Sequence, residues 1–492
     1  PEKIPFTTIT SESSSALYQS HEKVYPREVS GWFQNIRKLV INSVLVLFYG
    51  LAWLDWSDHQ AVLFDLPARQ FHIFEFTFWP QDFYLLTGLL IIAALTLFAA
   101  TALAGRLWCG YACPQTVWTE MFLWIERVTE GHYKKRQKLD AGPWHFQKLW
   151  RKTLKQTLWI TLALWTGITF VGYFTPIKEL TSNLLNLNLG GWEWFWVLFY
   201  GFATYGNAGF LREQVCKYMC PYARFQSAML DNDSLVISYD QQRGEPRKGS
   251  TPRAGTAAND DPPVPLNAGD CVNCEICVQV CPTGIDIRNG LQYECIGCAA
   301  CIDACNTVMD KIGKPRGLIR YTSENLLNQA QSNSEPFDAV SERKALLKNI
   351  FRPRMLIYGF LWLGLITAFI TIVATRSPTA MDIIRDRGTF YQTVVDGYTD
   401  NVYTLKIMNK TNTSQDYTLS VSSHENATLI LQDHTIRVAP GSVLDIPVRV
   451  RLPRLANNEG GPEPIHFQLN CTTLGSITTA DSIFWMPEVD AR

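Results

Sequence analysis

The sequence predicts a multidomain membrane protein, in which an α-helical transmembrane bundle of about five spans carries an inserted cysteine-rich module and a C-terminal all-β sandwich. Three observations predict this fold class. Long apolar runs and 16 tryptophans are typical of helices that cross a bilayer. Eight cysteines at regular spacing lie within residues 271–305, and short segments of alternating apolar and polar residues fill residues 380–492. The formal net charge of −1 indicates no nucleic-acid partner.

Five apolar runs are the predicted spans. They cover residues 39–54, 83–105, 157–177, 192–211 and 355–374. The first four belong to a transmembrane region at residues 36–235, which follows a cytoplasmic N-terminal segment at 1–35. Basic residues flank one end of every run, whereas the loops 55–82 and 178–191 at the opposite ends are acidic or nearly neutral. The positive-inside rule therefore places the N-terminus in the cytoplasm and the C-terminus outside.

The fourth run, residues 192–211, is the weakest of the five, because it contains Glu193, Asn207 and three glycines. A buried core helix is the alternative for this segment. The runs 83–105 and 355–374 carry no charged residue, so both are expected to be membrane spans and not buried core helices.

The cysteine-rich module covers residues 269–320. It reads C-x2-C-x2-C-x3-C-P and then C-x2-C-x2-C-x3-C, the pattern that holds two [4Fe–4S] clusters in ferredoxins of the bacterial type. In that pattern the fourth cysteine of each run binds the cluster of the other run. The predicted ligands are therefore Cys271, Cys274, Cys277 and Cys305 for one cluster, and Cys281, Cys295, Cys298 and Cys301 for the other.

Disulfides and zinc are the alternatives for these eight cysteines. Disulfides fit poorly, because the flanking sequence indicates a reducing compartment. Structural zinc usually takes two C-x2-C pairs per ion, not triplets with a distant fourth ligand. Asn306 stands where a proline commonly follows the last cysteine, which affects the local turn and not the ligand set.

Two segments connect the module to the rest of the chain. Residues 236–268 are rich in Pro, Gly, Asp and Arg and are predicted to be a linker. Residues 321–354 are predicted to be a cytoplasmic connector, which leads into the fifth transmembrane helix at 355–374. Beyond that helix, about seven short strands in residues 380–492 predict an immunoglobulin-like sandwich in the periplasm. Its single cysteine, Cys471, is expected in the core.

A second group of cysteines repeats one short motif. Residues 109–114 and 216–221 both read C-x3-C-P, and each copy follows the inner end of an apolar run. If these segments are helical, a spacing of four places both sulfurs of a pair on one face, and the proline ends or kinks the turn. The two pairs then bring four thiolates together as a candidate catalytic and metal site, formed by Cys109, Cys113, Cys216 and Cys220.

Several interpretations of these four cysteines stay open. Thiolates are preferred ligands of a soft metal such as Cu(I). The pairs could also form a redox-active dithiol or hold a further iron–sulfur centre. Four buried structural cysteines are the remaining possibility.

Two patterns that the sequence lacks limit the redox cofactors that it can be expected to bind. None of the eight histidines lies within a predicted span, which excludes a b-type haem held by two intramembrane histidines. No G-x-G-x-x-G run opens a predicted helix, so no dinucleotide site is expected and the electron donor must come from outside the chain.

The order of these parts resembles the FixG/RdxA family of membrane-bound polyferredoxins, the cytochrome c oxidase accessory proteins called CcoG. The resemblance covers nearly the whole chain and implies a protein of the bacterial inner membrane that assists assembly of the cbb-type cytochrome c oxidase. It also implies a metalloreductase, which reduces Cu(II) to Cu(I) for the oxidase copper centre with electrons from an external donor. The cysteines of residues 271–305 would store electrons, and the C-x3-C-P pairs would form the copper or redox site.

The implied partners are the membrane, subunits of the cbb-type oxidase or copper-delivery proteins, and an unknown electron donor. Two other functions stay open. One is a respiratory electron-transfer subunit that passes electrons from quinol to a partner. The other is a non-enzymatic assembly scaffold.

Overall fold

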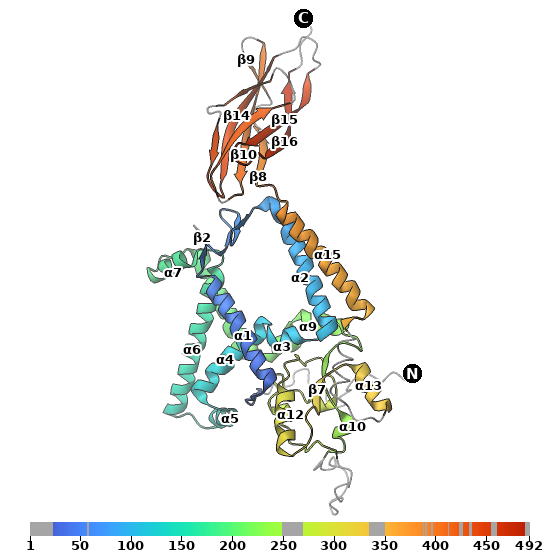
Figure 1. Cartoon of the computed structure of the whole chain (residues 1–492). Helices are drawn as coiled ribbons and strands as arrows, with labels where there is room; N and C mark the ends of the chain where they lie inside the picture. Colours follow the sequence, from blue (N-terminus) through green and yellow to red (C-terminus); the bar gives the residue numbers. More distant parts are fainter. Residues whose placement is uncertain are drawn as a thin grey trace, which may run out of the picture. The chain divides into compact units, whose positions relative to one another are not determined.

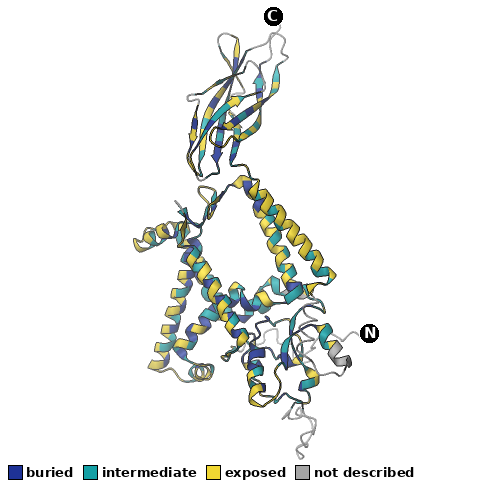
Figure 2. Ribbon diagram, in the orientation of Figure 1, coloured by how far each residue is buried: buried dark blue, intermediate teal, exposed yellow. Residues whose placement is uncertain are grey.

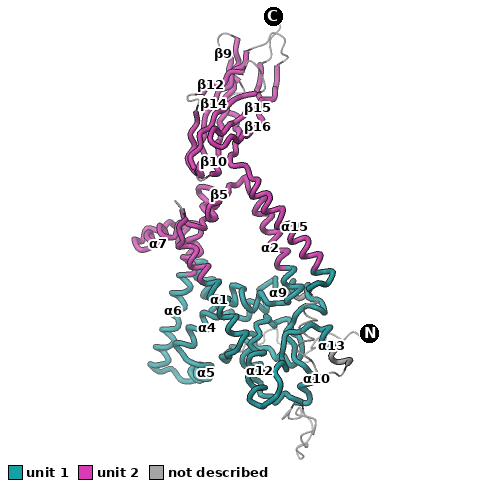
Figure 3. Tube along the Cα trace, in the orientation of Figure 1, with its two compact units in different colours: residues 1–45, 98–165, 199–355 teal, residues 46–97, 166–198, 356–492 magenta. Residues whose placement is uncertain are grey.

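The computed structural model describes residues 23–56, 59–247, 269–333, 350–386, 388, 391–394, 397–411, 413–422, 427–431, 435–453 and 460–487. The chain forms two compact units (Figure 3). Unit 1 comprises residues 1–45, 98–165 and 199–355, and unit 2 comprises residues 46–97, 166–198 and 356–492. Parts of three predicted segments lie outside the described residues: 1–22 of the N-terminal segment, 248–268 of the linker and 334–349 of the connector.

Every predicted span overlaps a helix, and Figure 1 labels α1, α2, α6 and α15 among them. These helices are α1 (Trp32–Leu51), α2 (Phe83–Ala104), α6 (Phe146–Val171), α8 (Gly191–Thr204) and α15 (Pro353–Ala374). A π-helical segment, Tyr205–Leu211, follows α8 directly, so the fourth run is helical along its length.

Two helices in the described part of the chain, Pro80–Ala104 and Pro353–Ala374, have the length and apolar composition that crossing a membrane requires. Figure 2 shows both largely exposed, and no residue of α15 is buried. They contact each other where Trp362 Nε1 donates a hydrogen bond to Thr96 Oγ1 over 2.8 Å. The other three helices differ, because α1 and α6 carry basic residues near their N-terminal ends and α8 has only 14 residues.

The loops on the acidic side of the predicted membrane are more structured than the sequence suggested. Residues 55–82 contain two small antiparallel sheets, β1–β2 and β3–β4–β5, and residues 178–191 contain most of a short helix, α7 (Ile177–Leu185). The strands are β1 (Asp55–Trp56), β2 (His59–Gln60), β3 (Val62–Asp65), β4 (Gln70–Ile73) and β5 (Phe76–Phe78).

Unit 1 also contains shorter helices, among them those that carry or follow the C-x3-C-P pairs. They are α3 (Leu107–Tyr111), α4 (Pro114–Glu130), α5 (Tyr133–Ala141), a π-helical turn at Val215–Met219 and α9 (Pro221–Met229). Phe122 and Ile125 of α4 pack with Trp159 of α6 in a buried cluster. Beside this cluster the fully buried Glu126 pairs with Arg136 at 2.8 Å and with Arg212 at 2.6 Å.

The ferredoxin module is closed by a pair of antiparallel strands, which corrects the predicted linker. Residues 236–239 form β6 (Val236–Tyr239), which pairs with β7 (Ile319–Thr322). Burial alternates along β6: Ile237 and Tyr239 are buried, whereas Val236 and Ser238 are only partly buried, as in a strand with one face in the core. The module also contains the helices α10 (Gln241–Gly244), α11 (Ile276–Gln279) and α12 (Ala300–Lys311), and α13 (Glu324–Asn333) follows it.

The C-terminal domain is a β-sandwich, as predicted. One sheet has the strand order β12–β14–β10–β8 with β9 paired to β10, and the other has the order β13–β11–β15–β16. Buried residues from both sheets form one core, and Cys471 is among them at 1% exposure. The strands are β8 (Thr379–Arg385), β9 (Gln392–Val394), β10 (Tyr398–Asn409), β11 (Gln415–Val421), β12 (Thr428–Ile430), β13 (Ile436–Val438), β14 (Val443–Pro453), β15 (Gly461–Cys471) and β16 (Ile477–Met486).

A buried ion triad joins the sandwich to the ends of α2 and α15 within unit 2. Asp82, which precedes α2, pairs with Arg376, which follows α15, and with Lys410 of the sandwich at 3.0 Å. The Asp82 side chain is almost fully buried, so this carboxylate depends on both cations for its charge compensation.

Candidate functional site

The eight module cysteines line two cavities in unit 1. The first cavity is lined by one predicted ligand set, Cys271, Cys274, Cys277 and Cys305. The second cavity is lined by the other set, Cys281, Cys295, Cys298 and Cys301, with Cys277 at its edge. Their remaining walls are mostly apolar, and β6 contributes to both through Tyr239 in the first cavity and Ile237 in the second. The structure thus groups the cysteines as the spacing predicts.

The backbone around the two cavities repeats itself. Asn273 and Gly297, which precede the second cysteine of each run, both have positive φ. Glu275 and Ala299, which follow that cysteine, also adopt the left-handed conformation. Such a conformation costs a non-glycine residue about 1–3 kcal/mol, and turns that contain left-handed residues can direct successive N–H groups into an anion-binding concavity. This backbone fits an anionic sulfur cluster.

Burial makes the module thiols poor acids when they are alone. It raises the pKa of Cys295 and of Cys305 to about 12, and that of Cys277 to about 11. Thiolates at these positions therefore need a metal in place of the proton. Among the described residues, no three His, Cys, Asp or Glu side chains converge as ligands of one ion. The four cysteines that line each cavity are the donor set that a [4Fe–4S] group needs, so they fit one such group per cavity.

The four C-x3-C-P thiols come together at one place in unit 1. Cys109 interacts electrostatically with Cys113, Cys216 and Cys220, and Cys113 also interacts with Cys220. All four are free cysteines and all are partly buried. That these four thiols form one catalytic and metal site stays a prediction.

The local structure of each pair differs from the expected single helical face. Cys109 and Cys216 lie in short helical turns, whereas Cys113 and Cys220 are extended N-cap residues of α4 and α9. The cause is the proline that follows, because it disfavours the helical conformation of the preceding residue and is itself well suited to start a helix. The prolines therefore begin the next helices and do not end the previous ones.

This four-thiol site, defined by Cys109, Cys113, Cys216 and Cys220, packs against the second cavity. Cys109 and Cys216 contact the buried cluster formed around Ile296 and Cys298. Gly110 makes this approach possible, because a Cβ atom there would lie 2.9 Å from the backbone N and Cα atoms of Cys298. The first C-x3-C loop therefore lies directly on the backbone of a predicted cluster ligand.

Arg106, which precedes α3, connects the first C-x3-C-P motif to the second-cavity loop and to α9. Its guanidinium donates hydrogen bonds to the carbonyl oxygens of Tyr293, of Cys295 (3.4 Å) and of Ala223 (2.7 Å). The first two carbonyls belong to the second-cavity loop, and the third follows the second C-x3-C-P motif. The positive charge of Arg106 lowers the pKa values of Cys109 and Cys216 against the stronger effect of burial.

Burial is the main influence on the thiols of the four-thiol site. Burial and the neighbouring thiols raise the pKa of Cys109 to about 12 and that of Cys216 to about 11. A reactive dithiol needs a lowered thiol pKa, so these values argue against a simple dithiol. The backbone N–H groups of Gln115 and Thr116 point to Cys113, an arrangement that stabilises a thiolate at the start of α4.

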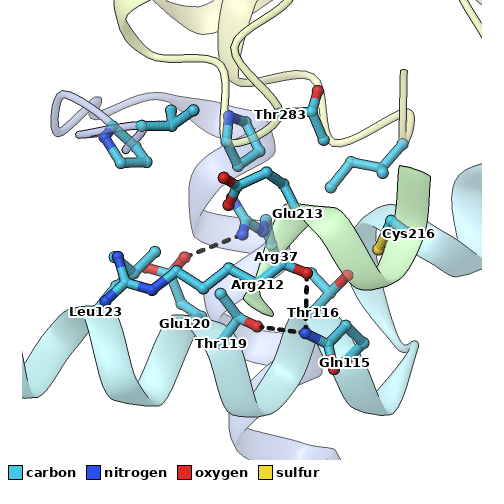
Figure 4. Close-up of a pocket in the computed structure, with 14 residues that line it drawn as sticks. Arg37, Gln115, Thr116, Thr119, Glu120, Leu123, Arg212, Glu213, Cys216 and Thr283 are labelled. Atoms are coloured by element: carbon cyan, nitrogen blue, oxygen red, sulfur yellow. Dashed lines mark hydrogen bonds and ion pairs between the residues drawn. The ribbon is translucent and has the colours of Figure 1, made fainter. Parts of the chain in front are cut away.

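A small pocket opens beside this site (Figure 4). Figure 4 shows it between α4, the N-terminal half of α1, the segment 212–216 and a loop of the module. Its polar and charged lining residues are Arg37, Gln115, Thr116, Thr119, Glu120, Arg212, Glu213, Cys216 and Thr283. Cys216 is the one member of the four-thiol site among its lining residues.

Several residues of the site were missed in the sequence analysis. Arg106 and Glu213 lie within three residues of a C-x3-C-P motif, but only the fold shows what they contact. Tyr111, inside the first motif, is hydrogen-bonded to Tyr321, whose hydroxyl donates to the Gly297 carbonyl over 2.6 Å. The short run of β-branched and aromatic residues that ends at Tyr239 was the signal that could have identified its strand.

Family comparisons agree with this organisation. Residues 211–324 match the family described as "4Fe-4S dicluster domain", residues 86–136 match "4Fe-4S binding domain", and residues 369–487 match "IG-like fold at C-terminal of FixG". The 86–136 match includes Cys109 and Cys113, and the 211–324 match includes Cys216, Cys220 and all eight module cysteines.

The chain is also similar to relatives over most of its length. It is 39% identical to Protein RdxB of Cereibacter sphaeroides, covering 88% of each chain, and 36% identical to the nitrogen fixation protein FixG of Rhizobium meliloti, covering 90% of each. A solved FixG-related protein from Vibrio parahaemolyticus is 31% identical over 22% of this chain and 97% of its own, with a TM-score of 0.20. The chain therefore belongs to the FixG/RdxA/RdxB family of iron–sulfur electron-transfer proteins, which combine 4Fe-4S domains with a C-terminal immunoglobulin-like domain.

Proposed function

We propose that this protein reduces Cu(II) to Cu(I) at the four-thiol site, as an assembly factor of a cbb-type cytochrome c oxidase. The observation that carries the proposal is the direct packing of that site on the second cavity, through Cys109, Cys216 and Gly110. Electron transfer between two centres is favoured when little protein separates them.

The chemistry of the residues supports this role. When bound, a [4Fe–4S] group supplies a one-electron donor, which an external reductant restores. Reduction of Cu(II) takes one electron per ion, and thiolates such as those of Cys109 and Cys216 hold the softer Cu(I) product. Arg106 holds the two centres together through its three carbonyl contacts.

We further propose five transmembrane spans, formed by α1, α2, α6, α8 and α15. The chain passes between the two compact units at five points, after residues 45, 97, 165, 198 and 355, and each point lies within one of these helices. With the basic flanks inside, the module faces the cytoplasm and the sandwich faces the periplasm of a bacterial inner membrane. The sandwich would then meet oxidase subunits or copper-delivery proteins there.

A second function is favoured by one specific observation. The match of residues 86–136 to a 4Fe-4S binding domain includes Cys109 and Cys113. The four-thiol site would then hold a further iron–sulfur centre, and the protein would relay electrons from a donor such as quinol to a respiratory partner. Thiolates are ligands both of Cu(I) and of iron–sulfur centres, so the four cysteines suit either one.

An anaerobic copper-reduction assay, combined with iron analysis, distinguishes the copper reductase from the respiratory electron relay. The purified protein is reduced with dithionite, freed of excess reductant and mixed with Cu(II) while a chelator specific for Cu(I) is followed. A variant with serine at Cys109, Cys113, Cys216 and Cys220 is treated in parallel. Stoichiometric Cu(I) that is lost in the variant at unchanged iron content supports the copper reductase.

Loss of four irons per chain in that variant supports the additional cluster instead. Clusters that never reoxidise with Cu(II) in the wild-type protein would contradict copper reduction. If both proteins differ only in how much accumulates in the membrane, the scaffold function is favoured.

A further inference from the structure

We propose that α4, α5 and the unit 1 part of α6 form a surface that faces the inner leaflet of the membrane and binds an anionic phospholipid at the turn between α5 and α6. This inference rests on the proposed span α6 and not on copper reduction. We call this the lipid-facing surface, and it consists of exposed side chains within residues 124–164, all of which belong to unit 1.

One face of α6 is apolar and exposed. Large exposed apolar side chains recur there every three or four residues, and they are Phe146, Leu149, Trp150, Leu154 and Leu158. Figure 2 shows exposed residues along this helix. The stripe begins before the apolar run 157–177, so it extends the predicted span towards the N-terminus by about three helical turns.

The lysines of α6 lie on the opposite face and are turned inward. Lys148 and Lys155 are each 4% exposed. Lys152 and Lys155 both pair with Glu130 at 2.9 Å. A surface helix in water has the reverse arrangement, with apolar residues inward and charged residues outward. Charged residues inside a membrane instead face the protein interior and pair with one another, as the lysines of α6 do.

The helix α4 has the same inverted arrangement. Its acidic residues Glu126 and Glu130 are fully buried, whereas Trp124 and Val128, four residues apart, are exposed. A cluster of buried apolar residues joins α4 to α6. The inversion therefore covers two helices that pack together, with their charges between them and their apolar side chains outside.

The polar residues within the exposed stripe need no water. The hydroxyl of Thr157 donates a hydrogen bond to the Thr153 carbonyl oxygen over 3.0 Å, and the hydroxyl of Thr161 donates to the Thr157 carbonyl oxygen over 2.9 Å. Polar groups in hydrocarbon must be satisfied inside the protein, and bonds to the carbonyl four residues earlier do this for threonine. These threonines are therefore compatible with acyl chains.

The length of α6 agrees with a position inside the bilayer. The helix has 26 residues and is therefore about 39 Å long. The hydrocarbon core of a bilayer is about 30 Å thick, and the bilayer with its headgroup regions is about 40–45 Å thick. The excess over the core places the first turns of α6, with Phe146 and Trp150, at the level of the inner headgroups.

The lysines of α5 supply positive charge for an anionic headgroup. Lys134, Lys135 and Lys138 are exposed, and Lys138 lies four and three residues after the other two, so all three share one face of α5. The carboxylates of residues 107–165 are instead paired with other cations of unit 1, and they are Glu120, Glu126, Glu130 and Asp140. The exposed charge near the turn is therefore positive, as a site for anionic lipid requires.

Aromatic side chains complete the site at the turn between α5 and α6. Trp144 is 74% exposed and Phe146 is 82% exposed. Lys148 Nζ lies 5.0 Å from the centre of the Trp144 ring, so a cation and an aromatic ring meet there. Exposed tryptophan together with lysine is typical of the membrane–water interface. A second copy of the chain is a poor occupant, because the same lysines would face one another across a symmetric contact.

Photocrosslinking in lipid nanodiscs tests the contact with lipid. The crosslinking residue benzoylphenylalanine replaces Phe146 in the full-length protein, which is placed in nanodiscs of phosphatidylcholine and phosphatidylglycerol in equal amounts, irradiated and measured by intact mass spectrometry. Leu164, within the proposed span, and Tyr391, an exposed aromatic residue of the sandwich, are the control positions. We expect the mass of one phospholipid to be added at Phe146 and at Leu164 and none at Tyr391, with unchanged iron content in each protein.

The outcomes separate this inference from the proposed topology. Lipid attached at Leu164 but not at Phe146 would overturn the lipid-facing surface and leave the span in place. Lipid at neither position would overturn the span as well. Attachment of Phe146 to a second copy of the chain would show a dimer contact in place of the lipid site. None of these outcomes depends on Cu(I) formation.

The selectivity for the headgroup is tested by removing charge from α5. With the crosslinker at Phe146, attached phosphatidylglycerol should exceed phosphatidylcholine by about threefold or more. The combined variant Lys134→Gln, Lys135→Gln and Lys138→Gln should take both lipids equally, and arginine at the same positions should keep the preference. Lys311→Gln with Lys314→Gln, at exposed positions of the module, should keep it too. Equal attachment of both lipids without these variants would overturn the anionic site, and a preference that survives the glutamines would overturn its assignment to α5.

Discussion

Arg106 provides a positive charge that is held by backbone carbonyls alone in the interactions described above. We expect Arg106→Gln to make the reduction potential of the second-cavity cluster more negative, because a cation beside Cys295 favours the added electron. A tenfold change in the one-electron equilibrium corresponds to about 59 mV, and we expect a shift of about this size. A potentiometric titration followed by electron paramagnetic resonance measures it.

Two control variants separate charge from position. Arg106→Lys keeps the positive charge, so its second-cavity cluster should have a reduction potential close to that of the wild type. Arg288→Gln removes a cation that lines the first cavity and pairs with Asp286 at 2.7 Å, so it should leave the second potential unchanged. An Arg106→Gln protein with wild-type potentials would show that Arg106 only connects the parts.

His72 provides a pH-dependent contribution to stability outside the predicted spans. Burial and the stacked ring of His59, 4.3 Å away, lower the pKa of His72 below its usual value of 6.5. The unfolded chain therefore binds more protons as the pH falls below about 6.5, and stability is lost in that direction. Thermal unfolding at pH 7.5 and 5.5 should show a larger decrease in Tm for the wild type than for His72→Phe. Equal decreases would contradict this.

At the scale of elements, the contact between α3 and the second-cavity loop depends on one glycine. An added Cβ at Gly110 would lie 2.9 Å from backbone atoms of Gly297 and Cys298, which cannot move away easily. We expect Gly110→Ala to destabilise unit 1 by about 1–3 kcal/mol, as overpacking does, and to slow Cu(I) formation. Gly50→Ala in α1 is the matched control, because its added methyl group would meet nothing within 4 Å.

The ion triad at the base of the sandwich is the second element-scale feature. Asp82→Asn would leave Arg376 and Lys410 without their shared carboxylate in a buried position. Removing one partner of a buried pair costs about 3–5 kcal/mol, so we expect a clear decrease in the denaturant midpoint of unit 2. Limited proteolysis should then cut more readily between α15 and β8. An unchanged midpoint would mean that water compensates the two cations.

At the scale of the whole molecule, the five-span topology makes a prediction about access. Thr473→Cys in the sandwich and Lys314→Cys in the module are both at exposed positions. In intact spheroplasts a membrane-impermeant maleimide should label the first and not the second. Labelling of both from outside, or of neither, would contradict the proposed orientation.

Much of the molecule was predictable from regular patterns in the sequence. The C-x2-C-x2-C-x3-C spacing predicted how the cysteines group around the two cavities, because three ligands of each set lie close together in sequence. Alternation predicted the sandwich, since each strand carries its own signal.

The features that sequence analysis missed depend on contacts between distant residues. Strand β6 pairs with β7, about 80 residues later, and neither has a long pattern of its own. The approach of Gly110 to Cys298 joins segments almost 190 residues apart. The prolines after Cys113 and Cys220 did carry a local signal, because they favour an extended cysteine and a new helix.

The pairing of β6 with β7 has a consequence for how this protein could have arisen. The strands bring the entry and exit of the ferredoxin module side by side, at Val236 and Thr322. Domain insertions are tolerated best where the two ends of the guest lie close together. The module is thus suited to exchange as a unit, and we expect another two-cluster ferredoxin with adjacent ends to fit the same place and to change the reduction potentials of the protein.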